Sequence, residues 1–165
     1  PDGWKHLEDP RVVKENFKDF SGGTAEVISS IENVYKWGLF RYPLKQSWYN
    51  DRVILIGDAA HPTLPFLAQG AAMAIEDSFV LASKIFEFSN SSVAFKEFRR
   101  ERFPRVQRVV LASTKNAHIF HLSNIISRRV FQVSLRFLSK FFPHLLVKRF
   151  NWIYDHNVTN KHYSS

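Results

Sequence analysis

Apolar and polar residues follow two different periods along this chain. One period predicts β-strands and the other predicts helices. Aromatic residues alternate along 34–40, which predicts a β-strand. A short apolar run at 53–56 (VILI) follows two charged residues and is closed by Gly57. A β-branched run bounded in this way predicts a buried strand that ends at the glycine.

The other apolar residues recur at helical spacing. After Gly70, the side chains of Ile75, Phe79 and Ala82 lie on one face of an expected helix. The polar break at 89–92 (SNSS) predicts a turn and an N-cap, and Pro104 is expected to kink the following helical region rather than end it. Further helices are expected at 11–19, 24–31, 93–102, 105–119 and 131–142.

Asp58 stands at the carboxyl end of the expected strand 53–56. In open α/β sheets, ligands collect outside the carboxyl ends of the strands. A carboxylate at that place can accept hydrogen bonds from the hydroxyls of a sugar or sugar alcohol. The plainer alternative is that Asp58 only caps a turn.

The expected helix that begins at Gly70 also favours a ligand. Its first backbone N–H groups have no partner within the helix and can hold a partly negative oxygen. Pro62 and Pro65 stiffen the loop that precedes it, so that a polar site there is preorganised. The small residues that would let a flat ring approach the backbone are Ala68, Gly70, Ala71 and Ala72.

The order of these residues resembles a known motif. The stretch 57–62 (GDAAHP), followed by Pro65 and by Gln69-Gly70, is similar to the second FAD motif of the class A flavoprotein aromatic hydroxylases, specifically their salicylate hydroxylase-like group. The similarity continues at 35–40 (YKWGLF), 105–108 (RVQR), 121–123 (HLS) and 150–154 (FNWIY). It therefore extends over nearly the whole chain.

The resemblance implies a set of cofactor-binding residues. In the family, the aspartate at the place of Asp58 binds the ribityl chain of FAD, which favours the ligand role over the turn-capping one. The proline matching Pro65 lies beside the reactive edge of the isoalloxazine ring, and 69–71 approach its pyrimidine end. Loop rigidity and an ordinary helix start are the structural alternatives. The cofactor-binding residues implied are Gly57, Asp58, Pro65, Gln69, Gly70 and Ala71.

Other residues near the motif have less specific expectations. Four residues are candidates for the pocket of the aromatic substrate, with core packing as the alternative: Leu64, Phe66, Tyr35 and Trp37. A lone histidine is more often structural than an acid or base, so His61 is expected to be structural. The pair at 76–77 (ED) is expected to support its helix rather than react.

The chemistry implied by the resemblance is that of an FAD-dependent monooxygenase. NADH or NADPH reduces FAD, and O2 then forms a flavin hydroperoxide that transfers a hydroxyl group to a small aromatic substrate. The protein contributes orientation, exclusion of water and electrostatic support. No residue is nominated as the general base, and no metal site is expected.

The resemblance also implies the fold class, an α+β or α/β fragment. Residues 1–50 are expected to be the end of the substrate-domain sheet with a return linker, and 51–88 the last strand, loop and helix of a Rossmann-like FAD-binding domain. Residues 89–165 would be C-terminal packing helices. The six glycines give no GxGxxG spacing. We therefore expect the chain to be the C-terminal portion of a hydroxylase whose absent N-terminal half is its partner.

Composition restricts the remaining possibilities. A chain of 165 residues that is 45% hydrophobic can bury a core, and its 16 Phe suggest further packing on the absent half. The lack of Cys excludes disulfides and fits a reducing cytosol, so a cytoplasmic protein is expected. No apolar run reaches the ~18 residues that a transmembrane segment needs.

The formal charge of +8 leaves alternative functions open. Nucleic-acid binding is not expected, because the common recognition signatures are missing. Solvated helix faces explain the charge, and it could also attract an anionic aromatic substrate. A basic amphipathic helix on a membrane surface at 125–150 is a sharper alternative. A non-catalytic remnant or partner-binding piece, lacking the ADP-binding half, is another.

Overall fold

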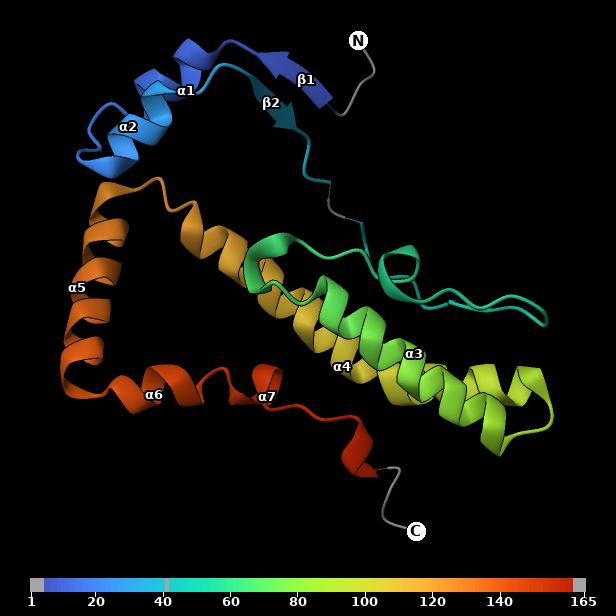
Figure 1. The fold of residues 1–165 in the computed structure, drawn as a ribbon. Helices are drawn as coiled ribbons and strands as arrows, with labels where there is room; N and C mark the ends of the chain where they lie inside the picture. Colours follow the sequence, from blue (N-terminus) through green and yellow to red (C-terminus); the bar gives the residue numbers. More distant parts are fainter. Residues whose placement is uncertain (1–4, 41, 162–165) are drawn as a thin grey trace. The chain divides into compact units, whose positions relative to one another are not determined.

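The computed structural model describes residues 5–40 and 42–161. The chain forms two compact units, Pro1–Phe40 and Arg41–Ser165, and each is described by itself. Figure 1 gives the element labels used below. The three-part division with boundaries at residues 50 and 88 stays a prediction.

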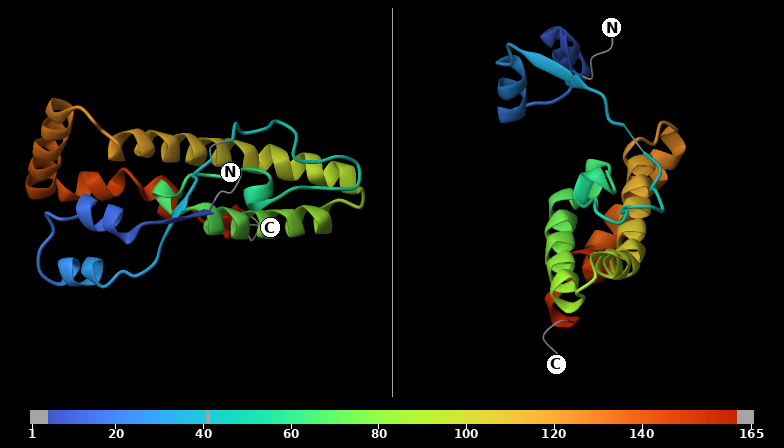
Figure 2. Two further views of the ribbon diagram at one scale, coloured as in Figure 1. Left: turned by 90° about the horizontal axis from the view of Figure 1, so that it is seen from above. Right: turned by 90° about the vertical axis from the view of Figure 1, so that its right-hand side faces the viewer.

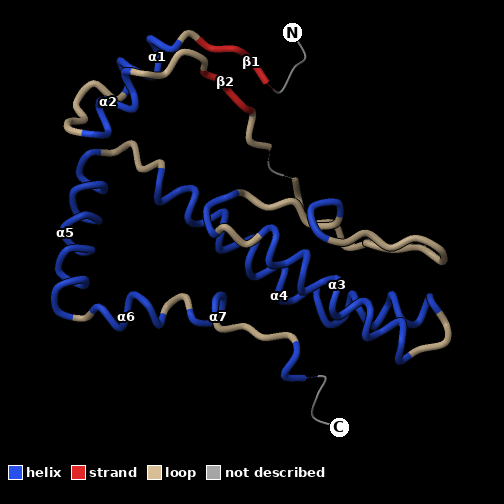
Figure 3. The backbone as a smooth tube through the Cα atoms, viewed as in Figure 1, coloured by secondary structure: helices blue, strands red, loops and turns tan. Residues whose placement is uncertain are grey.

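The first unit is a two-stranded antiparallel sheet with two short helices between its strands (Figure 3). Strand β1 (Lys5–Glu8) pairs with β2 (Val34–Trp37), with His6 opposite Lys36. Helix α1 (Pro10–Asn16) begins there because the Asp9 side chain accepts a hydrogen bond from the Arg11 backbone N–H. Helix α2 (Gly23–Ser29) completes the unit. Both helices and the strand predicted at 34–40 are therefore present, each shorter than expected.

The second unit is built on two long helices that pack side by side in all the views (Figure 2). Helix α3 spans Gly70–Glu87 and α4 spans Ser91–Phe120. Asn90 caps α4 by accepting hydrogen bonds from the N–H groups of Ser92 and Val93, as the polar break predicted. The helix continues through Pro104, so the two expected helices 93–102 and 105–119 are one. The residues of the apolar core include Trp48, Met73, Val80, Phe98, Val106 and Val109.

The predicted strand at 53–56 is not formed as a strand in this chain. Within it, only Ile54 makes a β-bridge, to Tyr49, and the Leu55 N–H donates to the Trp48 carbonyl oxygen (2.8 Å). Val53 is 54% exposed. A strand forms only where a neighbouring strand pairs with its backbone along its length. Among the described residues, only 48–50 pair with this run. The Rossmann-like character of this region stays a prediction.

Shorter helices follow α4. Helix α5 (Ile125–Phe141) begins earlier than the predicted 131–142 because Asn124 caps it through the N–H groups of Ile126 and Ser127. Helices α6 (Pro143–Lys148) and α7 (Asn151–Tyr154) lead to the C-terminal segment. Among residues 5–40 and 42–161, no helix has the length and apolar character needed to cross a membrane.

Candidate functional site

The GDAAHP motif forms a tight turn against α3. Residues Gly57–Ala59 make a 3-10 turn, and Gly57 has a φ of +56°, a conformation that residues with a side chain rarely adopt. A Cβ atom at Gly57 would also lie 3.1 Å from the Ala74 Cβ on α3. Glycine is therefore required here both by the backbone conformation and by the closeness of the helix.

The turn presents Asp58 to solvent at the start of α3. Asp58 is exposed, and its Oδ1 atom lies 3.7 Å from where a Cβ of Gly70 would be. The carboxylate is thus free to bind a ligand and stands beside the N-terminus of an 18-residue helix. The structure brings together two parts of the predicted site, the Gly57-Asp58 turn and the helix start at Gly70.

The first turn of α3 has the form of an anion-accepting helix start. Gln69 is the N-cap residue and makes no side-chain capping hydrogen bond, and the Met73 N–H is the first to bond, to the Gln69 carbonyl oxygen (2.9 Å). The N–H groups of 70–72 therefore precede the first intrahelical bond. Ala71 is exposed and Gly70 is half-buried, so small residues leave this backbone accessible.

The loop between the turn and the helix carries backbone strain. Pro65 begins a second 3-10 turn, Pro65–Leu67, and is exposed. Ala68 follows with a φ of +51°, in the left-handed region that non-glycine residues seldom occupy. Strained residues of this kind persist only where the surroundings hold them, and they cluster at functional sites.

Side chains of α4 and α7 donate hydrogen bonds to the carbonyl oxygens of this loop. The Ser113 hydroxyl donates to the Leu64 carbonyl oxygen (2.7 Å), and the Asn116 amide donates to that of Phe66 (3.4 Å). The Tyr154 hydroxyl donates to the Leu67 carbonyl oxygen (3.4 Å). These bonds explain how the loop keeps its strained path.

The four candidate substrate-pocket residues are not brought together within one unit. Phe66 stacks on Phe120 with 5.8 Å between ring centroids and meets the His121 ring edge-on at 5.7 Å, so it has packing partners. Leu64 is half-buried in the same loop. Tyr35 and Trp37 belong to β2 in the first unit. Their substrate role stays a prediction.

A buried set of ionisable residues lies behind the turn. His61 is 1% exposed, and its Nε2 atom lies 2.6 Å from Asp77 Oδ2. The same oxygen accepts the Gly57 N–H at 2.9 Å, and Arg102 Nε donates to Asp77 Oδ1 at 2.8 Å. Burial alone would raise the pKa of Asp77, but the hydrogen bonds from His61, Gly57 and Arg102 outweigh it and lower the pKa. Asp77 is therefore an ionised acceptor, and His61 donates to it.

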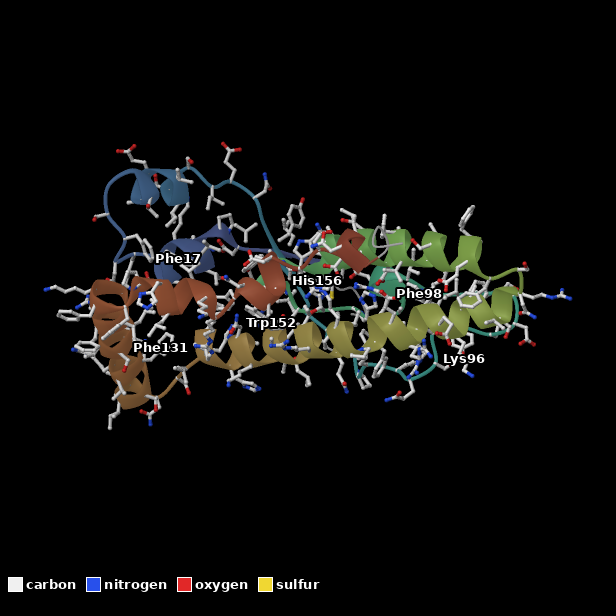
Figure 4. All side chains as sticks on the ribbon, turned by 90° about the horizontal axis from the view of Figure 1, so that it is seen from below. Phe17, Lys96, Phe98, Phe131, Trp152 and His156 are labelled. Atoms are coloured by element: carbon white, nitrogen blue, oxygen red, sulfur yellow. The ribbon has the colours of Figure 1, made fainter. Side chains whose placement is uncertain are left out.

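A second carboxylate joins this set to the C-terminal segment. Glu76 Oε2 lies 2.7 Å from Arg102 Nη2, and Arg105 binds both Glu76 oxygens at 2.7 and 2.8 Å. Arg105 also donates to the carbonyl oxygens of Trp152 and Ile153. Burial raises the pKa of Glu76, but the two arginines more than compensate and lower it. Figure 4 labels Trp152 and His156 in this segment.

The prediction that Glu76 and Asp77 support their helix rather than react fits these contacts, as does a structural His61. The sequence reasoning did not find Arg102, Ser113 or Asn116. A signal existed for the charged pair: Asp77 lies between Met73 and Val80 on the buried face of α3, and Arg102 lies between Phe98 and Val106 on that of α4. A charge at a core position of an amphipathic helix predicts a buried partner.

Comparison with known proteins identifies the family. The model of the family described as "FAD binding domain" matches residues 1–113, which is more than half of the chain. The chain belongs to this FAD-binding family. The match includes the turn at Asp58, the whole of α3 and the part of α4 that carries Arg102 and Arg105.

Curated proteins match more than half of the chain. The chain is 35% identical over 123 residues to 3-amino-4-hydroxybenzoate 2-monooxygenase PtnB3 of Streptomyces platensis, covering 74% of this chain and 31% of that protein. It is 38% identical over 97 residues to 3-hydroxybenzoate 6-hydroxylase 1 of Aquipseudomonas alcaligenes, covering 59% and 25%. The chain therefore spans about a third or less of the length of these relatives.

Solved structures show the same fold. A salicylate hydroxylase substrate complex superposes with a TM-score of 0.76 at 22% identity, covering 97% of this chain and 38% of that one. Klebsiella pneumoniae HpxO complexed with FAD and uric acid gives a TM-score of 0.65 at 24% identity, covering 82% and 36%. This chain therefore has the fold of a part of each of these two structures.

Proposed function

We propose that this chain supplies the part of an FAD-dependent aromatic monooxygenase that contacts the ribityl chain and isoalloxazine ring of FAD. The observation that carries the proposal is the exposed Asp58 carboxylate beside the uncapped first turn of α3. A hydroxyl-bearing chain and a ring with partly negative oxygens match these two groups. The names of the curated relatives, which are hydroxylases and monooxygenases of aromatic acids, support the same proposal.

Each residue of the candidate site would make a different contact with FAD. Asp58 would accept hydrogen bonds from ribityl hydroxyls, since an exposed carboxylate has open lone pairs. The N–H groups after Gln69, at Gly70 and Ala71, would donate to the ring oxygen nearest the helix start. Pro65 would present a rigid backbone edge to the ring, and Gly57 would hold the turn in its left-handed conformation.

When bound, FAD would take two electrons from NADH or NADPH and use O2, so that one oxygen atom enters the aromatic substrate and the other leaves as water. This chain's own contribution is electrostatic and positional. The partial positive charge at the start of α3 stabilises negative charge on the adjacent ring. The tethers from Ser113 and Asn116 keep the loop in place without reorganisation.

The proposed substrate is a small aromatic acid. The chain carries a formal charge of +8, and a positive surface raises the rate at which an anion arrives. The relatives named above are hydroxylases of benzoates, which are anions at neutral pH. The substrate, like the use of NADH or NADPH, belongs to the proposal for the full-length protein that carries this chain.

Substitution of Asp58 tests the proposal. In the full-length protein, Asp58→Ala should weaken FAD binding about tenfold or more, because hydrogen bonds to a charged acceptor are lost. FAD affinity is measured by quenching of flavin fluorescence on titration of the apoprotein. Asp51→Ala, at another exposed aspartate before the turn, is the matched control and should leave the affinity unchanged. Equal affinity in Asp58→Ala and the parent protein would contradict the proposal.

A further inference from the structure

One carboxylate attaches the Asp58 turn to α3 from both of its ends. Asp77 Oδ2 accepts the Gly57 N–H at 2.9 Å and receives the His61 Nε2 hydrogen bond at 2.6 Å. Gly57 and His61 bracket Asp58 in the sequence. A single oxygen atom on α3 thus fixes the backbone before Asp58 and the side chain after it.

The position of Asp77 is itself fixed by α4. Arg102 donates from Nε to the other carboxylate oxygen, Oδ1, at 2.8 Å. The side chains of Asp77, His61 and Arg102 are 0%, 1% and 2% exposed. In buried surroundings of low dielectric constant, hydrogen bonds to a charged group are stronger and directional. Asp77 is therefore held on one side by α4 and holds the turn on the other.

Within the described part of the chain, the backbone-to-backbone hydrogen bonds of the turn are short-range. The N–H groups of Ala60 and His61 both donate to the Gly57 carbonyl oxygen, at 3.0 and 2.9 Å. These bonds define the local 3-10 shape but do not orient the turn relative to α3. The orientation matters, because Asp58 and the Gly70 helix start face the same ligand only when the turn keeps its place.

We infer that Asp77 is a positioning residue for the cofactor turn, acting through Gly57 and His61. It aligns the Asp58 carboxylate with the N-terminus of α3 without touching the ligand. The inference rests on the proposed binding of FAD at Asp58. It assigns the buried ion pair a role in cofactor affinity in addition to its role in stability.

The test measures FAD affinity and stability separately in the full-length protein. Asp77→Asn keeps the shape of the side chain but removes its charge and one acceptor oxygen. We expect FAD binding to weaken about tenfold, since charge-assisted hydrogen bonds to the turn are lost. Val109→Ala, a fully buried apolar change on α4, is the control that lowers stability without altering the turn. Its FAD affinity should remain within about twofold of the parent.

A second pair of variants keeps the test decisive if Asp77→Asn does not fold. His61→Gln retains an N–H donor near the place of Nε2, whereas His61→Leu has none. Hydrogen exchange of the apoprotein should show the Gly57 amide exchanging about tenfold faster in His61→Leu than in His61→Gln, because the tether is lost. FAD affinity should follow the same order.

The outcomes separate the inference from the proposed function. If Asp58→Ala weakens FAD binding but Asp77→Asn behaves like Val109→Ala, Asp77 is structural only and the inference is wrong. Equal exchange and equal affinity in the two His61 variants would also overturn it. If Asp58→Ala leaves FAD affinity unchanged, the proposed function fails first.

Discussion

Helices α3 and α5 both have an apolar and a charged side, but they use them in opposite ways. The apolar face of α3 is buried against α4, and two of its acidic residues, Glu76 and Asp77, pair inside with Arg102 and Arg105. Helix α5 has no buried residue, and Arg128, Arg129, Arg136 and Lys140 lie on it with its exposed apolar side chains. The candidate site is built on the helix that encloses two of its carboxylates. Packing and paired charges at α3 allow the Asp58 turn a single arrangement, and a rigid ligand-binding turn needs such support.

The largest expected effect comes from breaking the enclosed charges. Asp77→Ala removes the buried acceptor of Arg102 Nε, the Gly57 N–H and His61 Nε2. We therefore expect a loss of about 3–5 kcal/mol in the free energy of unfolding. Urea unfolding followed by tryptophan fluorescence measures it, since buried Trp48 lies against His61 with ring centroids 5.3 Å apart. Ser78→Ala, at the exposed neighbouring position, should change the value by less than about 0.5 kcal/mol. Equal losses in both variants would mean that the buried network contributes little.

Acid should remove the same stabilisation. The pKa values of Asp77 and Glu76 lie below their ordinary values of 3.8 and 4.5, so the unfolded chain binds protons at a higher pH than the folded one. Their contribution is fully present above these ordinary values and is lost as the pH falls through the lowered ones. The stability difference between the parent and Asp77→Asn should therefore be largest near neutral pH and shrink below about pH 4. Urea midpoints recorded across this pH range measure it, and a constant difference would contradict it.

The same contrast explains what the sequence could predict. The helix start at Gly70 and the cap at Asn90 could be predicted from the sequence. Small residues and an Asn at the start of a helix act on the backbone next to them. The strand expected at 53–56 could not be decided locally, because a strand exists only with neighbours. Among the described residues, only 48–50 pair with it. The Asp58 turn was found by its motif. Its supports, Asp77 with Arg102 and Leu64 with Ser113, join residues 25 and 49 positions apart, and spacing alone does not reveal such pairs.

Two matched helix caps give a smaller effect. Asn90 and Asn124 each accept hydrogen bonds from two backbone N–H groups at the starts of α4 and α5. Asn90→Ala should cost about 1 kcal/mol of global stability, because α4 belongs to the packed core. Asn124→Ala should instead fray α5 locally, with faster hydrogen exchange after residue 125 and a smaller shift of the urea midpoint. Equal shifts in both variants would show that α5 unfolds together with α3 and α4.

The smallest expected effect is that of Val133→Ala, which is compared with the same substitution at a buried position. Val109 is fully buried on α4, whereas Val133 on α5 is 64% exposed. Val109→Ala removes two methyl groups from the core and should cost about 2 kcal/mol, through lost burial and the cavity left behind. Val133→Ala exchanges a β-branched residue for the best helix former at an exposed position, so its effect should stay within about 0.5 kcal/mol and be slightly favourable. Urea unfolding of both variants in the full-length protein measures the difference. A loss at Val133 as large as that at Val109 would show that Val133 is buried in the protein used for the measurement. The contrast between α3 and α5 would then describe this chain alone.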